Sequence, residues 1–195
     1  KVTPDMAEIN FAVSTQEADP KAAQEKNSQD LNKVIEFLKQ SGVDETSIQT
    51  SNYGLSPIYD YTSGQKITGY QMRTSILVSN LPIDKVGTLV SSSIATGINN
   101  IDSISYLSSK YDESYQEALK KAIESSKVKA EAIAAASGTS LGGIFHIEEV
   151  STYNNTRYVG YTAAESAAQG NPKSMVVEPG QLNVQAQVTV SYKIK

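Results

Sequence analysis

The closing stretch of the chain, Leu182 to Lys195, alternates apolar and polar residues almost without interruption. Side chains of a β-strand point alternately to its two faces, so this pattern predicts one long strand with one face in a core and the other in water or against a polar partner. The residues on the apolar side are Leu182, Val184, Ala186, Val188, Val190, Tyr192 and Ile194. The fold must therefore contain an amphipathic sheet.

Three other segments have the three-to-four-residue spacing of an amphipathic helix. One begins at Asp19-Pro20, with Asp19 as N-cap, and ends at Gly42. Pro82 opens the next, which closes at Gly97 and is expected to bury Ile83, Val86, Leu89 or Val90, and Ile94. The last runs from about 113 to 137, and its predicted inner face is Tyr115, Ala118, Leu119, Ala122, Ile123, Ala130, Ile133 and Ala134.

Strand-like segments fill the intervals at 6–13, 48–62, 67–79, 101–107 and 144–150. Pro57 predicts that the second is an edge strand or a bulged one, and 63–65 reads as a hairpin turn. The order β-α-β-β-α-β-α-β-β predicts an α+β fold with a largely antiparallel sheet and helices on one face. Its first six elements follow the ferredoxin-like, split βαβ order. We expect a single domain over 1–195, in which the aperiodic residues 153–174 form a flexible insertion or long loop.

Composition excludes several classes of function. The chain of 195 residues has no cysteine and one histidine, which argues against disulfides, thiolate zinc sites and cysteine nucleophiles. A formal net charge of −4 argues against binding to nucleic acid, which needs clustered lysine and arginine. No apolar run approaches the roughly 18 residues of a membrane-spanning helix. We therefore expect no cofactor, no metal, no nucleic-acid partner and no transmembrane span.

Two local patterns invite a catalytic interpretation. Residues 138–142 read Gly-Thr-Ser-Leu-Gly, which matches the letters of a nucleophile elbow. That motif needs a strand before the serine and a helix after it, whereas the sequence predicts the reverse order here. The sole histidine, His146, stands near Glu148 and Glu149, and a metal site would need more ligands from elsewhere. We assign no catalytic residue, although a pair of carboxylates that meets only in space stays open.

Tyrosine is unusually frequent, with 11 residues against three phenylalanines and no tryptophan. Tyrosine offers a large contact area plus a hydroxyl at small entropic cost, which suits interfaces with peptides or glycans. Cross-strand pairs on a half-exposed sheet explain the same residues equally well. The candidate interaction residues are Tyr59, Tyr61 and Tyr70 near the expected hairpin and Tyr158 and Tyr161 in the aperiodic stretch.

Several short segments taken together resemble a known family. They are 3–7 (TPDMA), 48–53 (IQTSNY), 57–61 (PIYDY), 67–70 (ITGY), Lys127 with 129–132 (KAEA), and 179–182 (PGQL). In this order and spacing they resemble the SIMPL domain family, also known as DUF541. Its members usually carry a further strand before the Pro-Asp segment, so the resemblance predicts a trimmed start.

The resemblance implies a bacterial exported or envelope protein without an established enzymatic activity, and homo-oligomers in some members. We therefore expect a non-enzymatic extracytoplasmic protein, located in the periplasm, at the cell surface or secreted. It would act through self-assembly or through contact with an envelope protein partner. One alternative is a monomeric binding module that uses the loop at 153–174 for a peptide, glycan or envelope partner. The other is the carboxylate-based hydrolase.

Overall fold

The computed structural model describes residues 1–62, 64–150, 159–161 and 179–195. The α+β prediction is confirmed, including the order of elements, and one short strand, β6, is added inside the segment predicted as a loop. The elements are β1 (Met6–Glu17), α1 (Pro20–Gln40), η1 (Glu45–Ser47), β2 (Ile48–Asp60), β3 (Lys66–Pro82), α2 (Ile83–Ser93), η2 (Ile94–Thr96), β4 (Asn100–Leu107), α3 (Tyr111–Ala136), β5 (Leu141–Glu149), β6 (Val159–Tyr161) and β7 (Val188–Ile194).

The described residues fall into two compact units. The sheet unit comprises those within 5–107 and 159–179, and the helix unit comprises those within 1–4, 108–158 and 180–195. The strands accordingly form two separate sheets, one of five strands and one of two. The expectation of one domain over the whole chain stays a prediction, and most of its proposed loop at 153–174 lies outside the described residues.

The sheet unit has the strand order β2-β3-β1-β4-β6, and every neighbouring pair is antiparallel. Its first four strands with α1 and α2 have the split βαβ arrangement that the order of elements predicts. The central strand β1 pairs with β3 over its whole length, from Met6 opposite Pro82 to Glu17 opposite Tyr70. On its other side β1 pairs with β4.

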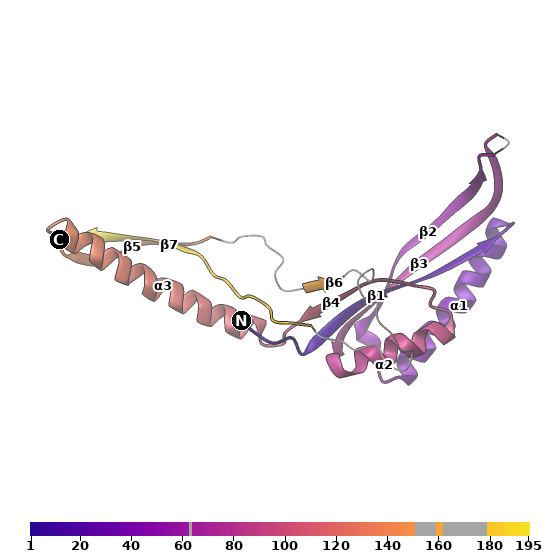
Figure 1. The fold of residues 1–195 in the computed structure, drawn as a ribbon, viewed down its shortest axis with the longest axis horizontal. Coiled ribbons are helices and arrows are strands. Elements are labelled where there is room, and N and C mark those ends of the chain that lie inside the picture. Colours follow the sequence, from indigo (N-terminus) through magenta and orange to yellow (C-terminus); the bar gives the residue numbers. More distant parts are fainter. Residues whose placement is uncertain (63, 151–158, 162–178) are drawn as a thin grey trace. The chain divides into compact units, whose positions relative to one another are not determined.

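The core of the sheet unit lies on one face of this sheet. Alternate residues of β1, namely Ile9, Phe11 and Val13, are fully buried on that face. The two helices α1 and α2 pack against it and contribute their own buried residues (Figure 1). These are Ala23, Asn27, Val34 and Leu38 from α1 and Val86, Gly87, Leu89, Val90 and Ser93 from α2. A sheet covered by two amphipathic helices is a complete two-layer unit.

The ends of α1 confirm the predicted caps. The Asp19 side chain accepts hydrogen bonds from the backbone N–H groups of Lys21, at 2.9 Å, and Ala22, at 3.0 Å. Those amides would otherwise have no partner in the first turn of the helix. At the other end, Gly42 has a φ of +81°, the left-handed conformation that glycine adopts without steric cost.

One inner residue of the second helix was predicted wrongly. Ile94 is 64% exposed, because α2 ends at Ser93 and the chain continues as the 3₁₀ turn η2. A 3₁₀ turn has about three residues per turn instead of 3.6, so the apolar spacing of the α-helix no longer points Ile94 inward. Gly97 closes this segment with a φ of +116°, as the sequence indicated.

The helix unit consists of α3 beside the antiparallel pair β5–β7 (Figure 1). In residues 182–192 the apolar positions are buried or half-buried and the polar ones exposed, which confirms the alternation, whereas Ile194 is 68% exposed. The regular strand nevertheless begins only at Val188. Leu182, 1% exposed, forms an isolated antiparallel bridge with Val2. No helix in the described part of the chain is long and apolar enough to cross a membrane.

Candidate functional site

Two surfaces gather nearly all the large hydrophobic side chains that the described residues expose, and Ile94 is the exception. The hairpin patch lies on β2 and β3 and comprises Tyr53, Leu55, Tyr59, Tyr61 and Ile67. The β5 patch lies in the helix unit and comprises Val128, Ile133, Ile144, Phe145, Ile147 and Ile194. Exposed apolar side chains concentrated on one hairpin or in one small unit indicate interaction surfaces, whereas scattered single ones need no explanation.

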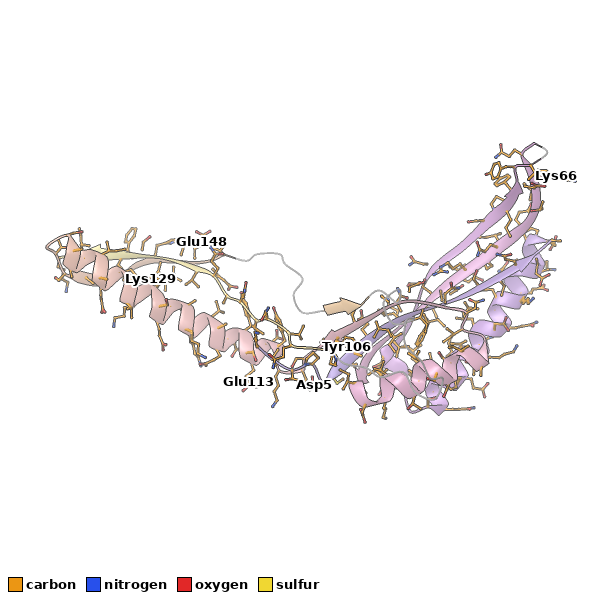
Figure 2. All side chains as sticks on the ribbon, in the orientation of Figure 1. Asp5, Lys66, Tyr106, Glu113, Lys129 and Glu148 are labelled. Carbon is orange, nitrogen blue, oxygen red and sulfur yellow. The ribbon has the colours of Figure 1, made fainter. Side chains whose placement is uncertain are left out.

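The hairpin patch has two parts: Tyr59, Tyr61 and Ile67 lie where β2 and β3 extend past the end of β1, and Tyr53 and Leu55 lie on the edge strand β2 beside the covered sheet. The pairing of β1 with β3 stops at Tyr70, and Lys66 lies near the hairpin tip (Figure 2). Met72, which the core covers, is 1% exposed, whereas its cross-strand neighbour Leu55 is 48% exposed. The apolar character of the strands therefore continues beyond the part of the sheet that the core covers.

The structure brings two of the predicted tyrosines together. The rings of Tyr59 and Tyr61 lie 6.0 Å apart at an interplanar angle of 40°, and their exposed fractions are 37% and 72%. Tyr70 is half-buried and stands opposite Pro57. Tyr158 and the side chain of Tyr161 lie outside the described residues. The interaction role of these tyrosines stays a prediction.

Sequence reasoning missed Leu55 and Ile67 in the hairpin patch. Both are apolar residues of predicted strands, and such residues are usually assigned to a core. The available signal was the length of the two strands, which exceeds that of the first strand with which they share the sheet.

The outer edge of β2 is irregular. Its pairing with β3 shifts register between Ser51 and Gly54 and again between Ile58 and Tyr59, and Asn52 has a φ of +50°. The position of β2 at the edge of the sheet and these register shifts confirm the prediction, made from Pro57, of an edge strand or a bulged one. Bulges and proline are features that hinder another strand from pairing with an edge. The hairpin therefore offers side chains to a partner more readily than it offers backbone.

At the hairpin tip the carboxylate of Asp60 is already engaged. It accepts hydrogen bonds from the backbone N–H of Thr62 at 2.8 Å and from the Thr62 hydroxyl at 2.6 Å. These bonds favour the charged form and hold the pKa of Asp60 below its ordinary value. Asp60 stands opposite Lys66 in the ladder, so the two formal charges of the tip balance.

Four members of the β5 patch lie on a sheet of two strands that α3 covers incompletely, and the other two, Val128 and Ile133, lie on α3. Ile147 stands opposite Val190 and Ile144 opposite Tyr192. The hydroxyls of Tyr192 and Ser126 of α3 form a hydrogen bond of 2.9 Å, so Tyr192 faces the helix. Its cross-strand neighbour Ile144, and the pair of Ile147 and Val190, lie on the same face. Ile144 and Ile147 nevertheless remain 49% and 47% exposed, because α3 lies mainly over β7.

A second contact fixes the opposite end of α3 to β5. The hydroxyl of Tyr115 donates a hydrogen bond to a carboxylate oxygen of Glu149 at 2.5 Å. This bond to the neutral phenol raises the pKa of Tyr115 above its ordinary value. Ile133 of α3 was predicted to be inside, and this prediction is wrong, since its side chain is 68% exposed.

The two sequence patterns considered for catalysis or metal binding do not form a catalytic arrangement among the described residues. Residues 138–142 follow α3 and lead into β5, so a helix enters and a strand leaves, which is the reverse of a nucleophile elbow. The backbone of Ser140 pairs with Lys195 in both directions. His146 lies 3.9 Å from Glu148, with both side chains more than half exposed. Among the described residues, no group of three or more His, Asp or Glu could hold a metal ion.

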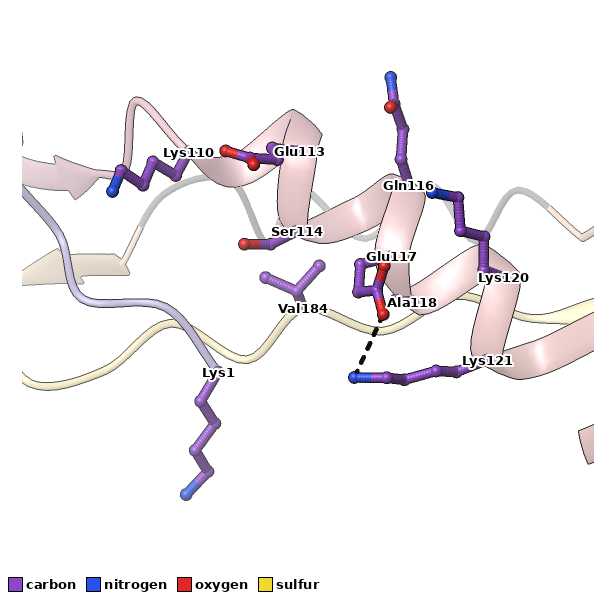
Figure 3. A pocket seen from close by; sticks show the side chains of 10 residues that line it. All are labelled: Lys1, Lys110, Glu113, Ser114, Gln116, Glu117, Ala118, Lys120, Lys121 and Val184. Carbon is purple, nitrogen blue, oxygen red and sulfur yellow. Dashed lines mark ion pairs between the residues drawn. The ribbon is translucent and has the colours of Figure 1, made fainter. Parts of the chain in front are cut away.

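A cavity of about 820 Å³ lies beside the first turns of α3 (Figure 3). Its lining carries four lysines, Lys1, Lys110, Lys120 and Lys121, together with Glu113, Glu117 and Val184. Lys121 is paired with Glu117 at 3.6 Å, and both side chains are more than half exposed. Exposed ion pairs of this type contribute little to binding or stability, so we assign no ligand to this cavity.

Comparison with known proteins agrees with the resemblance noted in the sequence. The SIMPL family model, described as "Protein of unknown function (DUF541)", matches residues 1–192. The 26 kDa periplasmic immunogenic protein of Brucella melitensis is 29% identical over 155 residues, which cover 76% of this chain and 62% of that protein. The chain thus spans less than two thirds of the Brucella protein.

Two further relatives carry the name "Uncharacterized protein YggE". The protein of Edwardsiella ictaluri is 28% identical over 172 residues, covering 85% of this chain and 71% of the relative. That of Escherichia coli K12 is 26% identical over 166 residues, covering 84% of this chain and 68% of the relative. Since the family model matches almost every residue, this chain belongs to the SIMPL (DUF541) family.

Proposed function

We propose that this chain is a non-enzymatic, extracytoplasmic protein of the cell envelope that acts through self-assembly or through contact with another protein. The observation that carries the proposal is the concentration of exposed apolar side chains in the hairpin patch and the β5 patch. A protein in water gains free energy by covering such surfaces, at roughly 25 cal/mol per Å². The name of the Brucella relative, a periplasmic protein, supports the location.

Self-assembly is tested by the mass of the purified chain. Light scattering coupled to gel filtration, over a wide range of protein concentration, is expected to give particles heavier than the 21.0 kDa chain. The mass should fall on dilution, since apolar association follows mass action. A particle of 21.0 kDa at every concentration would contradict self-assembly.

Capture of an envelope protein is a second candidate, favoured by the hairpin patch. Tyr59 and Tyr61 form an adjacent, exposed aromatic pair on a tip whose formal charges balance. Replacement of both by serine should abolish crosslinked capture of a partner from native envelopes. The particle mass of the purified protein, measured by light scattering, should not change. The control is Ile94→Ser, which alters an exposed hydrophobic residue of the same unit outside the hairpin patch. Capture that survives the double replacement rules this candidate out.

A further inference from the structure

The β5–β7 sheet is smaller than a sheet that is stable by itself. β5 pairs with β7 on one side, and no described residue pairs with its other edge. An isolated pair of strands is marginally stable in water and needs further strands or a helix packed against it, and α3 covers this pair only in part. The half-exposed Ile144 and Ile147 face the side on which α3 lies, so α3 leaves part of the apolar face of this layer uncovered.

Of the two outer edges, that of β5 is the better site for another strand. Val2 pairs with Leu182 through two backbone hydrogen bonds of 2.9 Å, so the extended segment that leads into β7 at Val188 already has a partner at that point. β5 instead carries the exposed apolar residues themselves. Its register shifts lie before His146, so 146–149 is a regular run whose outer backbone groups point away from β7.

We propose that a second copy of this chain adds its own β5 to this edge, in an antiparallel pairing with a two-fold axis at Ile147. This inference rests on the proposed self-assembly and names the surface that carries it. In this register Ile147 stands opposite the same residue of the second copy, on the face toward α3. His146 stands opposite Glu148 of the second copy on the other face, and the axis repeats that pair.

The pairing matches both the polarity and the charge of this short strand. Ile147 shares the α3 face with Val190, whereas His146 and Glu148 share the other face with Ser191 and Thr189. In the proposed pairing Ile147 therefore contacts the apolar Ile147 of the second copy. The imidazole of His146 lies opposite the carboxylate of Glu148 at two places related by the axis (Figure 2 marks Glu148). Two copies would form a four-stranded sheet with two helices on one face, the layer that a single copy leaves unfinished.

The first experiment replaces the residue on the axis. Ile147→Lys places two ammonium groups at the centre of the pairing, and we expect at least a tenfold increase in the dissociation constant, measured by sedimentation equilibrium. The matched control is Ile94→Lys, because Ile94 is a similarly exposed isoleucine in the sheet unit. The control should leave the dissociation constant within about twofold of the unmodified chain.

The second experiment exchanges the charges and does not depend on how Ile147→Lys folds. His146→Glu alone sets carboxylates opposite one another twice and should weaken the dimer about fivefold. Adding Glu148→Lys to His146→Glu recreates opposite charges at both places, and the double variant should return to within about twofold of the original dissociation constant. Circular dichroism confirms that each variant is folded.

The outcomes separate this inference from the proposed function. If the unmodified chain is monomeric at every concentration, self-assembly itself fails. If it assembles but Ile147→Lys is folded and associates as before, or the double charge variant is no better than His146→Glu, the β5 pairing is wrong while self-assembly stands. Weakening by Ile147→Lys together with recovery in the double variant establishes the pairing.

Discussion

The sheet unit and the helix unit are built from the same kinds of amphipathic strand and helix, yet they differ in how far they cover their own apolar residues. In the sheet unit the central strand β1 has Phe11 and its neighbours fully buried. In the described helix unit, Phe145 is 73% exposed, and the buried hydrophobic residues are Ala134 and Leu182. The amphipathic pattern of a segment therefore does not reveal whether its apolar face is covered.

The number of neighbouring strands and covering helices explains this difference in burial. β1 has a neighbour on each side and two helices above it, so its inner face meets protein in every direction. Among the described strands β5 has one neighbour, β7, and the helix above the pair lies mainly over β7. In the sheet unit the exposed apolar residues lie around the hairpin of β2 and β3, away from the covered face of β1, whereas in the helix unit they lie on the central layer of the unit itself.

The largest expected effect is a difference in unfolding free energy between truncating a phenylalanine of the sheet unit and one of the helix unit. Phe11→Ala removes a fully buried ring and should lower the free energy of unfolding by about 3–5 kcal/mol. Phe145→Ala removes an exposed ring and should change it by less than about 0.5 kcal/mol. Urea unfolding at low protein concentration measures both. Similar losses from the two variants would break the comparison.

A buried polar residue sharpens the comparison within the sheet unit. The Asn27 amide donates to the carbonyl of Val13 at 3.0 Å, and its carbonyl accepts from the Thr74 hydroxyl at 2.7 Å. Asn27→Leu leaves these buried groups without partners and should cost about 2–3 kcal/mol in urea unfolding. Thr74→Val removes one bond and should cost about 1 kcal/mol. A neutral Asn27→Leu would show that this network adds no stability.

Helix caps give a smaller, matched contrast. Asp19 caps α1 with two hydrogen bonds, so Asp19→Ala should lower the free energy of unfolding by about 1 kcal/mol. Lys110 occupies the N-cap position of α3, and its side chain makes no cap hydrogen bond. Lys110→Ala should therefore leave the free energy of unfolding nearly unchanged. Thermal unfolding followed by circular dichroism compares the two. Equal losses would mean that the cap bonds of α1 are not what stabilises its start.

The smallest expected effect is a pH dependence in the helix unit. The Glu149 carboxylate raises the pKa of Tyr115, so folding favours the neutral phenol. The stability that this bond adds is present below the ordinary tyrosine pKa of about 10 and is lost as the pH rises through the raised value. Glu149→Gln should lower the pKa of Tyr115 toward its ordinary value. Tyrosinate absorbance, corrected with Tyr115→Phe, measures the shift, and an unchanged pKa would contradict the hydrogen bond.

Much of the secondary structure could be predicted because its causes are local. The Asp19-Pro20 start and the Gly42 end of α1 depend on backbone groups within a turn of those residues. Pro57 lacks an N–H wherever it stands, so it could only lie at an edge or a bulge. Predictions failed where a neighbour was needed. The alternation over 182–187 marks an inner face, but these residues lie outside the regular strand β7, because a β-strand exists only beside another strand.

The candidate surfaces were predicted only in part for the same reason. Tyr59 and Tyr61 were chosen as an amphipathic residue type, whereas Leu55 and Ile67 are plain apolar residues of strands, and only the structure shows that Leu55 is exposed on the edge strand and Ile67 beyond the end of β1. His146 and Glu148 were considered for chemistry, and it is the pairing of β5 that puts them on one exposed face.

The amino-acid sequence by itself determined the family, the order of helices and strands, and which side of each strand is apolar. These properties are set by residue spacing and by backbone groups within a few positions of one another. Only the tertiary structure decided that the strands divide into two sheets and which apolar faces remain open. Burial is a property of pairs of surfaces, and the partner surface is brought into place by residues far away in the chain.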